Sequence, residues 1–158
     1  MNDEIIGSHE KVFAKLILER IYLKDASFES PNSPSVFETS WKPDLKVDIN
    51  TKASTLSDNR HEVVLRVTID AITEGQKSGF IAEIQQAGIF LIEGVSHGDL
   101  RKVLAVACPT TLFPYLREAL DSLIIKGGFP AINLAPINFE VVFDEALKQS
   151  QQRKTVTH

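Results

Sequence analysis

The stretch HEVVLRVTIDAITEGQKSGFIAEIQQAGIFLI, residues 61–92, decides the fold of this chain. Every second residue of its first part is apolar, in one row made by Val63, Leu65, Val67, Ile69 and Ala71. Such alternation is typical of a strand that buries one face. The segment EGQKSG, residues 74–79, has the composition of a turn, and the apolar run after it predicts another strand. The sequence therefore predicts an antiparallel hairpin at the centre of the chain.

The segments before this hairpin also have strand character. Residues 41–54, WKPDLKVDINTKAS, place Leu45, Val47 and Ile49 on one side and polar residues between them. Residues 11–29 are ambiguous, because their apolar residues fit a helix as well as a strand. The sequence RIYL and the poor helix formers after it favour a strand that ends near Phe28.

The carboxyl-terminal half is predicted to be helical. Asp99 is expected to cap a short apolar helix that Pro109 stops. A second helix is expected to start at Thr110 or Thr111, with Pro114 in its first turn, where a missing N–H costs little. This helix is expected to end at the sequence KGG, residues 126–128, with a glycine in the left-handed conformation.

Residues 129–138 read as an extended connector between this helix and a last one. Asn138 is expected to cap the last helix, and its apolar residues, including Phe143 and Leu147, recur at spacings of three and four on one face. Strands followed by helices predict an α+β fold. At 158 residues, without a linker or repeat, we expect one domain spanning residues 1–158, with residues 1–12 and about 152–158 flexible.

Composition narrows the class of function. Seventeen Lys and Arg against 21 Asp and Glu give a net charge of −4, which argues against a nucleic-acid binder. The single cysteine excludes an internal disulfide, and the polar start MNDEIIGSHEK lacks the pattern of a signal peptide. The uncharged apolar runs are shorter than the roughly 18 residues that cross a bilayer. We therefore expect a cytoplasmic protein that does not insert into membranes.

Cys108 is the one candidate nucleophile with a suggestive position, just before a predicted helix. Its apolar neighbours favour the alternative, a small buried side chain without chemistry. The histidines lack metal-ligand spacing, SHGD (residues 96–99) reads as a polar turn, and neither phosphate-binding glycine motif is present. The sequence thus predicts no catalytic residue, metal or cofactor.

Aromatic residues flank the proline-containing segment SPNSP, residues 30–34. Phe28 precedes it, and Phe37 and Trp41 follow it. Two interpretations stay open: the rings fill the core, or they border a shallow apolar groove that binds a partner.

Five segments in order resemble the SecB protein-export chaperones of bacteria. They are RIYLKDASFESPNSPSVF (residues 20–37), VVLRVTI (63–69), EIQQAGIF (83–90), CPTTLFPYLRE (108–118) and NLAPINF (133–139). The resemblance runs from about Leu16 to about Gln151. It implies a four-stranded antiparallel sheet with two main helices, assembled as a homotetramer that is a dimer of dimers. It also implies that Cys108 is structural, at the start of the long interface helix.

The resemblance further implies a function without catalysis. Family members hold unfolded precursor proteins in the cytoplasm without ATP, and deliver them to SecA, the ATPase of the export translocase. By position, the client-binding groove would be lined by Trp41, Leu45, Val47, Ile49, Phe143 and Leu147. The acidic patch for the basic, zinc-binding segment of SecA would comprise Asp25, Glu29, Ile81 and Glu83. Subunit contact would involve Ala82, Ile84 and Gln86.

The chain departs from the family pattern at Ala87, in its tail and in a longer amino-terminal extension, to which we assign no role. Ala87 stands where the family usually has a glycine, and we expect a small change of backbone there. The tail ends with Arg153, Lys154 and His158 where relatives carry an acidic segment, so a tail contact with SecA is in doubt. Two alternative functions remain: a SecB-like chaperone dedicated to a toxin–antitoxin system, and a small oligomeric enzyme that uses Cys108.

Overall fold

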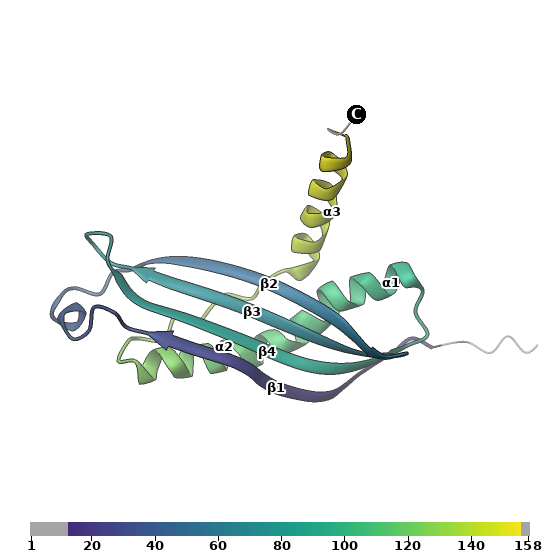
Figure 1. The fold of residues 1–158 in the computed structure, drawn as a ribbon, viewed down its shortest axis with the longest axis horizontal. Coiled ribbons are helices and arrows are strands. Elements are labelled where there is room, and N and C mark those ends of the chain that lie inside the picture. Colours follow the sequence, from purple (N-terminus) through teal and green to yellow (C-terminus); the bar gives the residue numbers. More distant parts are fainter. Residues whose placement is uncertain (1–12, 156–158) are drawn as a thin grey trace, which may run out of the picture.

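Four long strands form one antiparallel sheet in the computed structural model of the protein, which describes residues 13–155. They are β1 (Lys15–Glu29), β2 (Asp44–Ser57), β3 (Arg60–Ile72) and β4 (Ser78–Glu93), in the spatial order β1-β4-β3-β2 (Figure 1). The antiparallel pairing of β3 with β4 confirms the predicted hairpin. The strand choice for the ambiguous first segment is also confirmed. β1 and β2 are the two edges of the sheet.

The two faces of the sheet differ in burial, as the alternation predicted. The apolar row of β3, from Val63 to Ala71, is completely buried on the face we call inner. On β4 the residues Phe80, Ala82 and Ile84 share this inner face and are also fully buried. The side chains between them lie on the opposite, outer face and, apart from buried Val64, are at least partly exposed. One face of the sheet therefore supplies half of the core.

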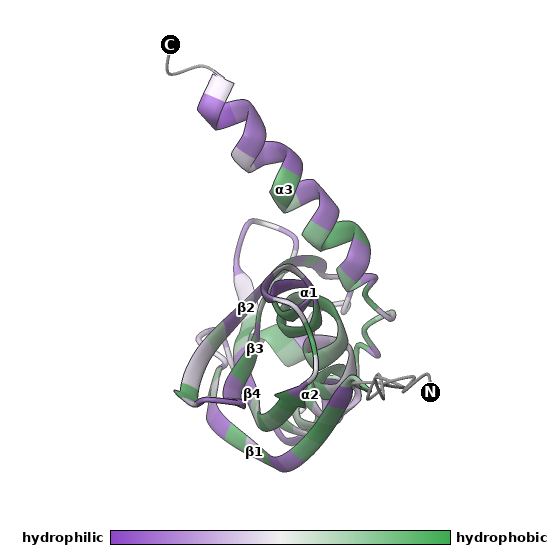
Figure 2. Cartoon of the chain, turned by 90° about the vertical axis from the view of Figure 1, so that its right-hand side faces the viewer, coloured by the Kyte–Doolittle hydropathy of each residue, from purple (hydrophilic) through white to green (hydrophobic). Residues whose placement is uncertain are grey.

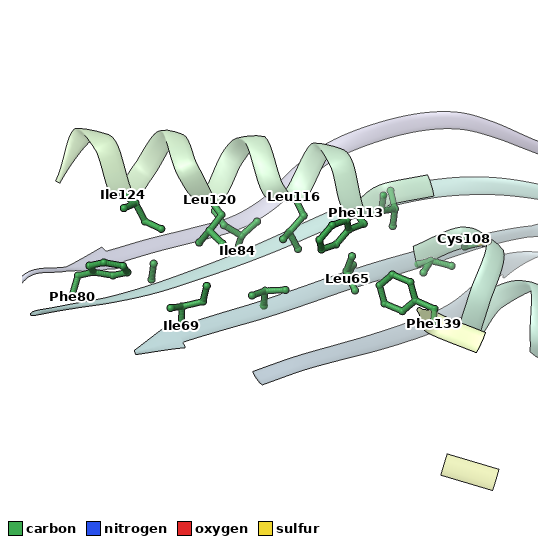
Figure 3. Close-up of a cluster of buried hydrophobic side chains, with 14 of the residues drawn as sticks. Leu65, Ile69, Phe80, Ile84, Cys108, Phe113, Leu116, Leu120, Ile124 and Phe139 are labelled. Atoms are coloured by element: carbon green, nitrogen blue, oxygen red, sulfur yellow. The ribbon is translucent and has the colours of Figure 1, made fainter. Parts of the chain in front are cut away.

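Helix α2 (Cys108–Lys126) covers the inner face and supplies the other half of the core. Its fully buried residues recur every four positions: Cys108, Leu112, Leu116, Leu120 and Ile124. Figure 3 shows Leu116, Leu120 and Ile124 directed from the helix toward the sheet side chains Leu65, Ile69, Phe80 and Ile84. Burial of each such leucine or isoleucine contributes about 1.5–3 kcal/mol.

The helix boundaries around Pro109 differ from the prediction. Helix α1 (His97–Lys102) continues through a π-helical segment, Val103–Ala107, directly into α2, and the backbone at both junctions is α-helical. Pro109 therefore does not stop a helix. It lies where the hydrogen bonding changes from the π to the α pattern, so its missing N–H falls at a natural irregularity of the ladder. The cap is also different: the Ser96 hydroxyl accepts the Asp99 N–H at 3.2 Å.

Pro114 lies inside α2, not in its first turn as predicted. A proline there removes the hydrogen bond to the carbonyl of Thr110, four residues earlier. Both residues are exposed, so water can reach the freed carbonyl. The hydroxyls of Thr110 and Thr111 donate to the carbonyls of Val106 and Ala107 at 2.6 and 2.9 Å, and these bonds support the junction.

The predicted glycine end of α2 is confirmed at Gly128, whose φ of 88° is in the left-handed region. The connector after it begins at Phe129, whose ring lies 4.7 Å from that of Trp41 and 5.1 Å from those of Phe37 and Phe80. Phe28 stacks on Phe80 at 5.8 Å. The aromatics around SPNSP and its short 3-10 helix (Ser35–Glu38) thus gather on Phe129. Phe28 and Trp41 thus pack against the core, whereas Phe37 remains 51% exposed.

Close approach explains two glycines at this cluster. A Cβ on Gly127 would lie 2.1 Å from the ring of Phe28, and a Cβ on Gly79 would lie 2.7 Å from the indole of Trp41. Both distances are far below van der Waals contact, so only glycine lets these rings lie flat against the backbone.

Helix α3 (Phe139–Thr155) starts at Asn138, whose side chain accepts the Val141 N–H at 3.2 Å, as predicted. The helix leads away from the sheet in two perpendicular views, and most of its length is hydrophilic (Figures 1 and 2). It includes residues 152–155, part of the segment that was expected to be flexible. Residues 1–12 and 156–158, for which flexibility was also expected, lie outside the described residues. No helix within residues 13–155 is long and apolar enough to cross a membrane.

Candidate functional site

An apolar row on edge strand β2 extends the core face beyond the helix that covers it. Leu45, Val47 and Ile49 pair with Ala71, Ile69 and Val67 of β3, all of which are buried on the inner face. Ile49 still packs against the core, but Leu45 and Val47 are 41% and 43% exposed. Exposed side chains of this size on a continuous apolar face are typical of a binding surface. Trp41, at one end of the row, packs on Phe80 and Phe129.

The row continues past Ile49 to residues that the sequence analysis missed. Thr51 and Ala53 follow in the same alternation and pair with Leu65 and Val63 on the inner face. Together with Arg101, Leu104 and Ala105 they line a hollow of about 220 Å³ between β2 and the helical segment before α2. The alternation of β2 could have revealed that Thr51 and Ala53 continue the row. Because Thr51 is polar and Ala53 is small, however, neither was recognised as part of an apolar surface.

The α3 residues of the predicted groove do not face the β2 row within the single chain. Phe139 anchors the start of α3 with its ring 6.4 Å from that of Phe113, and Lys102 contacts Glu140 at 3.0 Å. Phe143 and Leu147 follow on the part of α3 that leads away from the sheet, where both are half-buried (Figure 1).

The predicted acidic patch gathers on the outer face at the junction of β1 and β4. Glu29 pairs with Ile81, Ser27 with Glu83, and Asp25 with Gln85. Directly opposite residues of an antiparallel pair point to the same side, so Asp25, Glu29, Ile81 and Glu83 share one face. A bulge between Leu23 and Asp25 keeps both Lys24 and Asp25 on that face.

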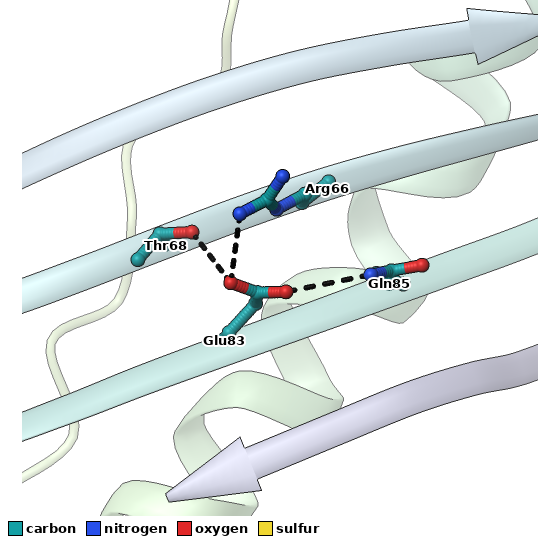
Figure 4. Close-up of polar contacts among 4 residues, drawn as sticks. All are labelled: Arg66, Thr68, Glu83 and Gln85. Atoms are coloured by element: carbon teal, nitrogen blue, oxygen red, sulfur yellow. Dashed lines mark hydrogen bonds and ion pairs between the residues drawn. The ribbon is translucent and has the colours of Figure 1, made fainter.

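The three carboxylates of this patch differ in their surroundings. Asp25 and Glu29 are exposed and have no hydrogen-bond or ion-pair partner among residues 13–155. Glu83 accepts from Arg66 at 3.0 Å, Thr68 at 3.1 Å and Gln85 at 3.4 Å (Figure 4). Desolvation raises the pKa of the Glu83 carboxyl, but these hydrogen bonds outweigh it, so the pKa lies below its ordinary value. Glu83 is therefore held as an anion by its neighbours, whereas Asp25 and Glu29 remain open to new contacts.

The comparison with protein families identifies the family. Residues 9–150 match the family model described as preprotein translocase subunit SecB. The chain belongs to the SecB family. A protein-export protein SecB of Marinobacter nauticus is 47% identical over 96% of this chain and 91% of its own length. That of Hahella chejuensis is also 47% identical, over 98% of this chain and 94% of its own.

A solved structure supports the fold independently. It is a SecB-like chaperone of Mycobacterium tuberculosis in complex with a peptide from the HigA1 antitoxin. The two chains superpose with a TM-score of 0.63 at 15% identity, over 77% of this chain and 90% of the other. At this identity the likeness concerns the fold alone.

The three residues that the SecB resemblance associates with subunit contact lie inside this chain. Ala82 and Ile84 are completely buried between β4 and α2. Gln86 is 6% exposed, and its side-chain amide donates to the carbonyl of Tyr22 at 3.0 Å. None of them offers a surface for direct contact, so any effect on assembly would pass through α2 or β1. Ala87, expected to alter the backbone, is regularly paired with Tyr22 and Val64 and keeps a negative φ.

Cys108 belongs to the core of this SecB chain. It is completely buried, and desolvation raises the pKa of its thiol to about 12. A nucleophilic cysteine needs the opposite, a lowered pKa and access to solvent. The burial and the raised pKa therefore argue against Cys108 as a nucleophile. Residues 13–155 also contain no group of three His, Cys, Asp or Glu side chains that could hold a metal ion.

We expect a disulfide reagent at pH 8 to modify Cys108 in the native protein only as fast as the chain unfolds. The folded thiol ionises near pH 12 and the unfolded thiol near roughly 8.5. The stabilisation by the neutral buried thiol is therefore complete below about pH 8.5 and is lost as the pH rises toward 12. The release of thionitrobenzoate, followed with and without urea, measures the reaction. Rapid labelling without urea would contradict the burial of this side chain.

Proposed function

We propose that the protein is an ATP-independent holdase of the cytoplasm, which binds unfolded precursor proteins, keeps them competent for translocation and delivers them to the SecA ATPase. The observation that carries the proposal is the exposed apolar row of β2 in a chain of the SecB family. Relatives at 47% identity are protein-export proteins, which supports the export role. We further infer one domain that assembles as a homotetramer, a dimer of dimers.

The apolar row suits unfolded clients because it does not require one sequence. Leu45 and Val47 offer apolar surface along an edge strand that has no strand partner on its outer side among residues 13–155. An extended chain can therefore bury apolar side chains there and pair its own backbone with the edge. Folded proteins expose few apolar side chains and few unpaired backbone groups. Preferential binding of the unfolded state delays folding by mass action, which needs no nucleotide. Phe143 and Leu147 of α3 would supply a second apolar surface in the assembled protein.

The primary test is light scattering coupled to size exclusion, with and without an unfolded, reduced precursor. We expect a mass near four times 17.6 kDa for the protein alone. The peak should take up the precursor and should not take up the same protein after folding. A monomer that ignores unfolded chains would overturn the proposal, and the SecB fold would then serve another function.

Replacement of Leu45 and Val47 by serine should weaken binding of the unfolded precursor about tenfold, because both side chains lose most of their apolar surface. Fluorescence anisotropy of a labelled precursor measures the affinity. The matched control is Leu56→Ser, which changes a 54%-exposed leucine of the same strand outside the row. Equal losses in the double variant and in this control would remove β2 from the binding surface.

For delivery, we infer that the acidic patch of Asp25, Glu29, Ile81 and Glu83 binds the basic, zinc-binding segment of SecA. Unpaired, exposed Asp25 and Glu29 support this, since they can accept new ion pairs without losing old ones. Four chains at −4 each give 4 × (−4) = −16, a charge that favours rapid encounter with a basic partner. Ala82, Ile84 and Gln86 would influence assembly through the elements that pack on them.

The alternative, a chaperone dedicated to a toxin–antitoxin system, has weaker support. The solved chaperone that binds an antitoxin peptide is 15% identical, against 47% for the export proteins. Binding of an antitoxin with no binding of other unfolded precursors would favour the alternative.

A further inference from the structure

The outer face of the sheet has a polar hollow that the proposed function does not use. It measures about 500 Å³ and receives residues from all four strands. Three of these residues are cations: Lys24 of β1, Lys52 of β2 and Arg66 of β3. We call it the basic hollow. Its other lining residues are Asn50, Ser54, Glu62, Val64 and Gln85.

The single carboxylate of the basic hollow is already occupied. Glu62 accepts from Lys24 at 2.7 Å through one oxygen and from the Tyr22 hydroxyl through the other. The hydrogen bond from Lys24, followed by that from Tyr22, lowers the pKa of the Glu62 carboxyl. Burial and the same contact raise the pKa of Tyr22 to about 12, so the hydroxyl remains the donor. Glu62 is thus committed to the β1 side of the hollow.

Lys52 remains without a partner. Within residues 13–155 its ammonium makes no hydrogen bond and no ion pair, although it lies near enough to Glu62 to favour the ionised carboxylate. Arg66 is shared, because one of its nitrogens contacts Glu83 at 3.0 Å. The hollow therefore holds three cations against one carboxylate inside it and one at its border.

The basic hollow and the acidic patch share a wall. Arg66 and Gln85 line the hollow, and both also donate to Glu83 of the patch. Figure 4 shows the Glu83 carboxylate directed toward Arg66 and Thr68 of β3, away from β1. A basic side chain that binds Glu83 must compete with Arg66. An anion in the hollow would ease this competition, because it offers Arg66 a replacement.

We propose that the basic hollow binds an acidic side chain of the same partner segment that docks on the acidic patch, an inference that rests on the proposed function. The partner then presents a basic and an acidic side chain side by side. Docking exchanges the Arg66–Glu83 ion pair for two intermolecular ion pairs, and Lys52 gains its first partner. Because the partner must place one basic and one acidic side chain correctly, these two ion pairs fix its position on the sheet. They also select against segments that carry only basic side chains.

The test compares two lysines of β2 for which simple electrostatics and the proposal predict opposite results. Lys52 lines the hollow, whereas Lys46 lies outside it, in the cross-strand row of Asp70, Ile81 and Glu29. Lys52→Glu and Lys46→Glu make the same charge change on the same outer face. If only negative charge attracts the partner, both variants should bind it more tightly. Lys46→Glu should then strengthen binding at least as much as Lys52→Glu, because Lys46 is closer to the acidic patch.

The probe is the zinc-loaded basic segment of SecA as a peptide, titrated calorimetrically into the full-length protein. We expect Lys52→Glu to weaken binding about threefold to tenfold and Lys46→Glu to leave it equal or tighter. A second peptide, with its Asp and Glu replaced by Asn and Gln, should bind the natural chain more weakly and should not distinguish it from Lys52→Glu.

Each outcome is decisive. Unchanged or tighter binding by Lys52→Glu overturns the hollow as a subsite, and so does an amide peptide that binds as well as the acidic one. Failure of the proposed function has a different signature: Asp25→Asn with Glu29→Gln would leave binding of the peptide unchanged. Circular dichroism and light scattering of each variant confirm that fold and assembly are intact.

Discussion

Replacement of Leu120 by alanine should lower the free energy of unfolding by about 2–5 kcal/mol. Leu120 is completely buried in the middle of α2, above Ile84 of the sheet (Figure 3). The loss combines the transfer free energy of the deleted atoms with the cavity that remains between helix and sheet. This is a large part of the total stability of a typical domain. Urea unfolding at a fixed protein concentration measures the change, because the proposed assembly would make stability depend on concentration.

The matched control for this experiment is Leu56→Ala, which makes the same chemical change at a leucine that is 54% exposed. We expect it to change the stability by no more than about 0.5 kcal/mol. Similar losses at both positions would show that α2 does not pack on the inner face as described.

Reversal of both unpaired carboxylates, Asp25→Lys with Glu29→Lys, should weaken binding of the SecA segment about a hundredfold at low salt. Each substitution replaces an attraction to the basic segment by a repulsion on the exposed end of β1. The stability should change little, since neither side chain has a partner among the described residues. Calorimetric titration with the zinc-loaded segment measures the affinity, and the difference should shrink as the ionic strength rises.

Asp44→Lys with Asp48→Lys is the control with equal charge. Both residues are exposed on β2 and point to the outer face, but β3 and β4 separate them from β1. General attraction would make the two double variants equally weak. A patch at β1 and β4 predicts that the control loses much less, and the opposite ranking would sink the assignment of Asp25 and Glu29.

The strands and the faces of their residues were predictable because alternation is a local signal. A period of two places Leu45, Val47 and Ile49 on one face of β2, and it places Ile81 and Glu83 together on one face of β4. The structure confirms both placements. The ambiguous first segment was decided correctly by β-propensity alone.

The helical junction was predicted wrongly because proline was taken as a stop signal. Pro109 and Pro114 both lie in a continuous helical path. The π-helical turn shifts the hydrogen bonds at Pro109, and solvent reaches the carbonyl that Pro114 leaves free. Neither condition is visible in a linear pattern, because each depends on which face of the helix is covered.

Part of the candidate site also needed the structure. The basic hollow joins Lys24, Lys52 and Arg66 from three strands, and only the register of the sheet brings them together. Likewise, the sequence placed Phe143 and Leu147 on one helix face but could not tell that α3 leads away from the strand row (Figure 1). Local periodicity gives the direction of a side chain, whereas cross-strand register and helix direction are tertiary properties.

The free edge of β2 has a consequence for the proposed binding of unfolded chains. An unpaired strand beside an exposed apolar row is a template on which sheets can grow, and its growth would trap the client together with the chaperone. The outer side of this strand alternates in sign through Asp44, Lys46, Asp48 and Lys52. Charged side chains along the edge of a sheet disfavour its pairing with a second copy, so they limit growth of the sheet beyond one added strand. In the proposed function, the same strand could then bind an unfolded chain without starting a larger sheet.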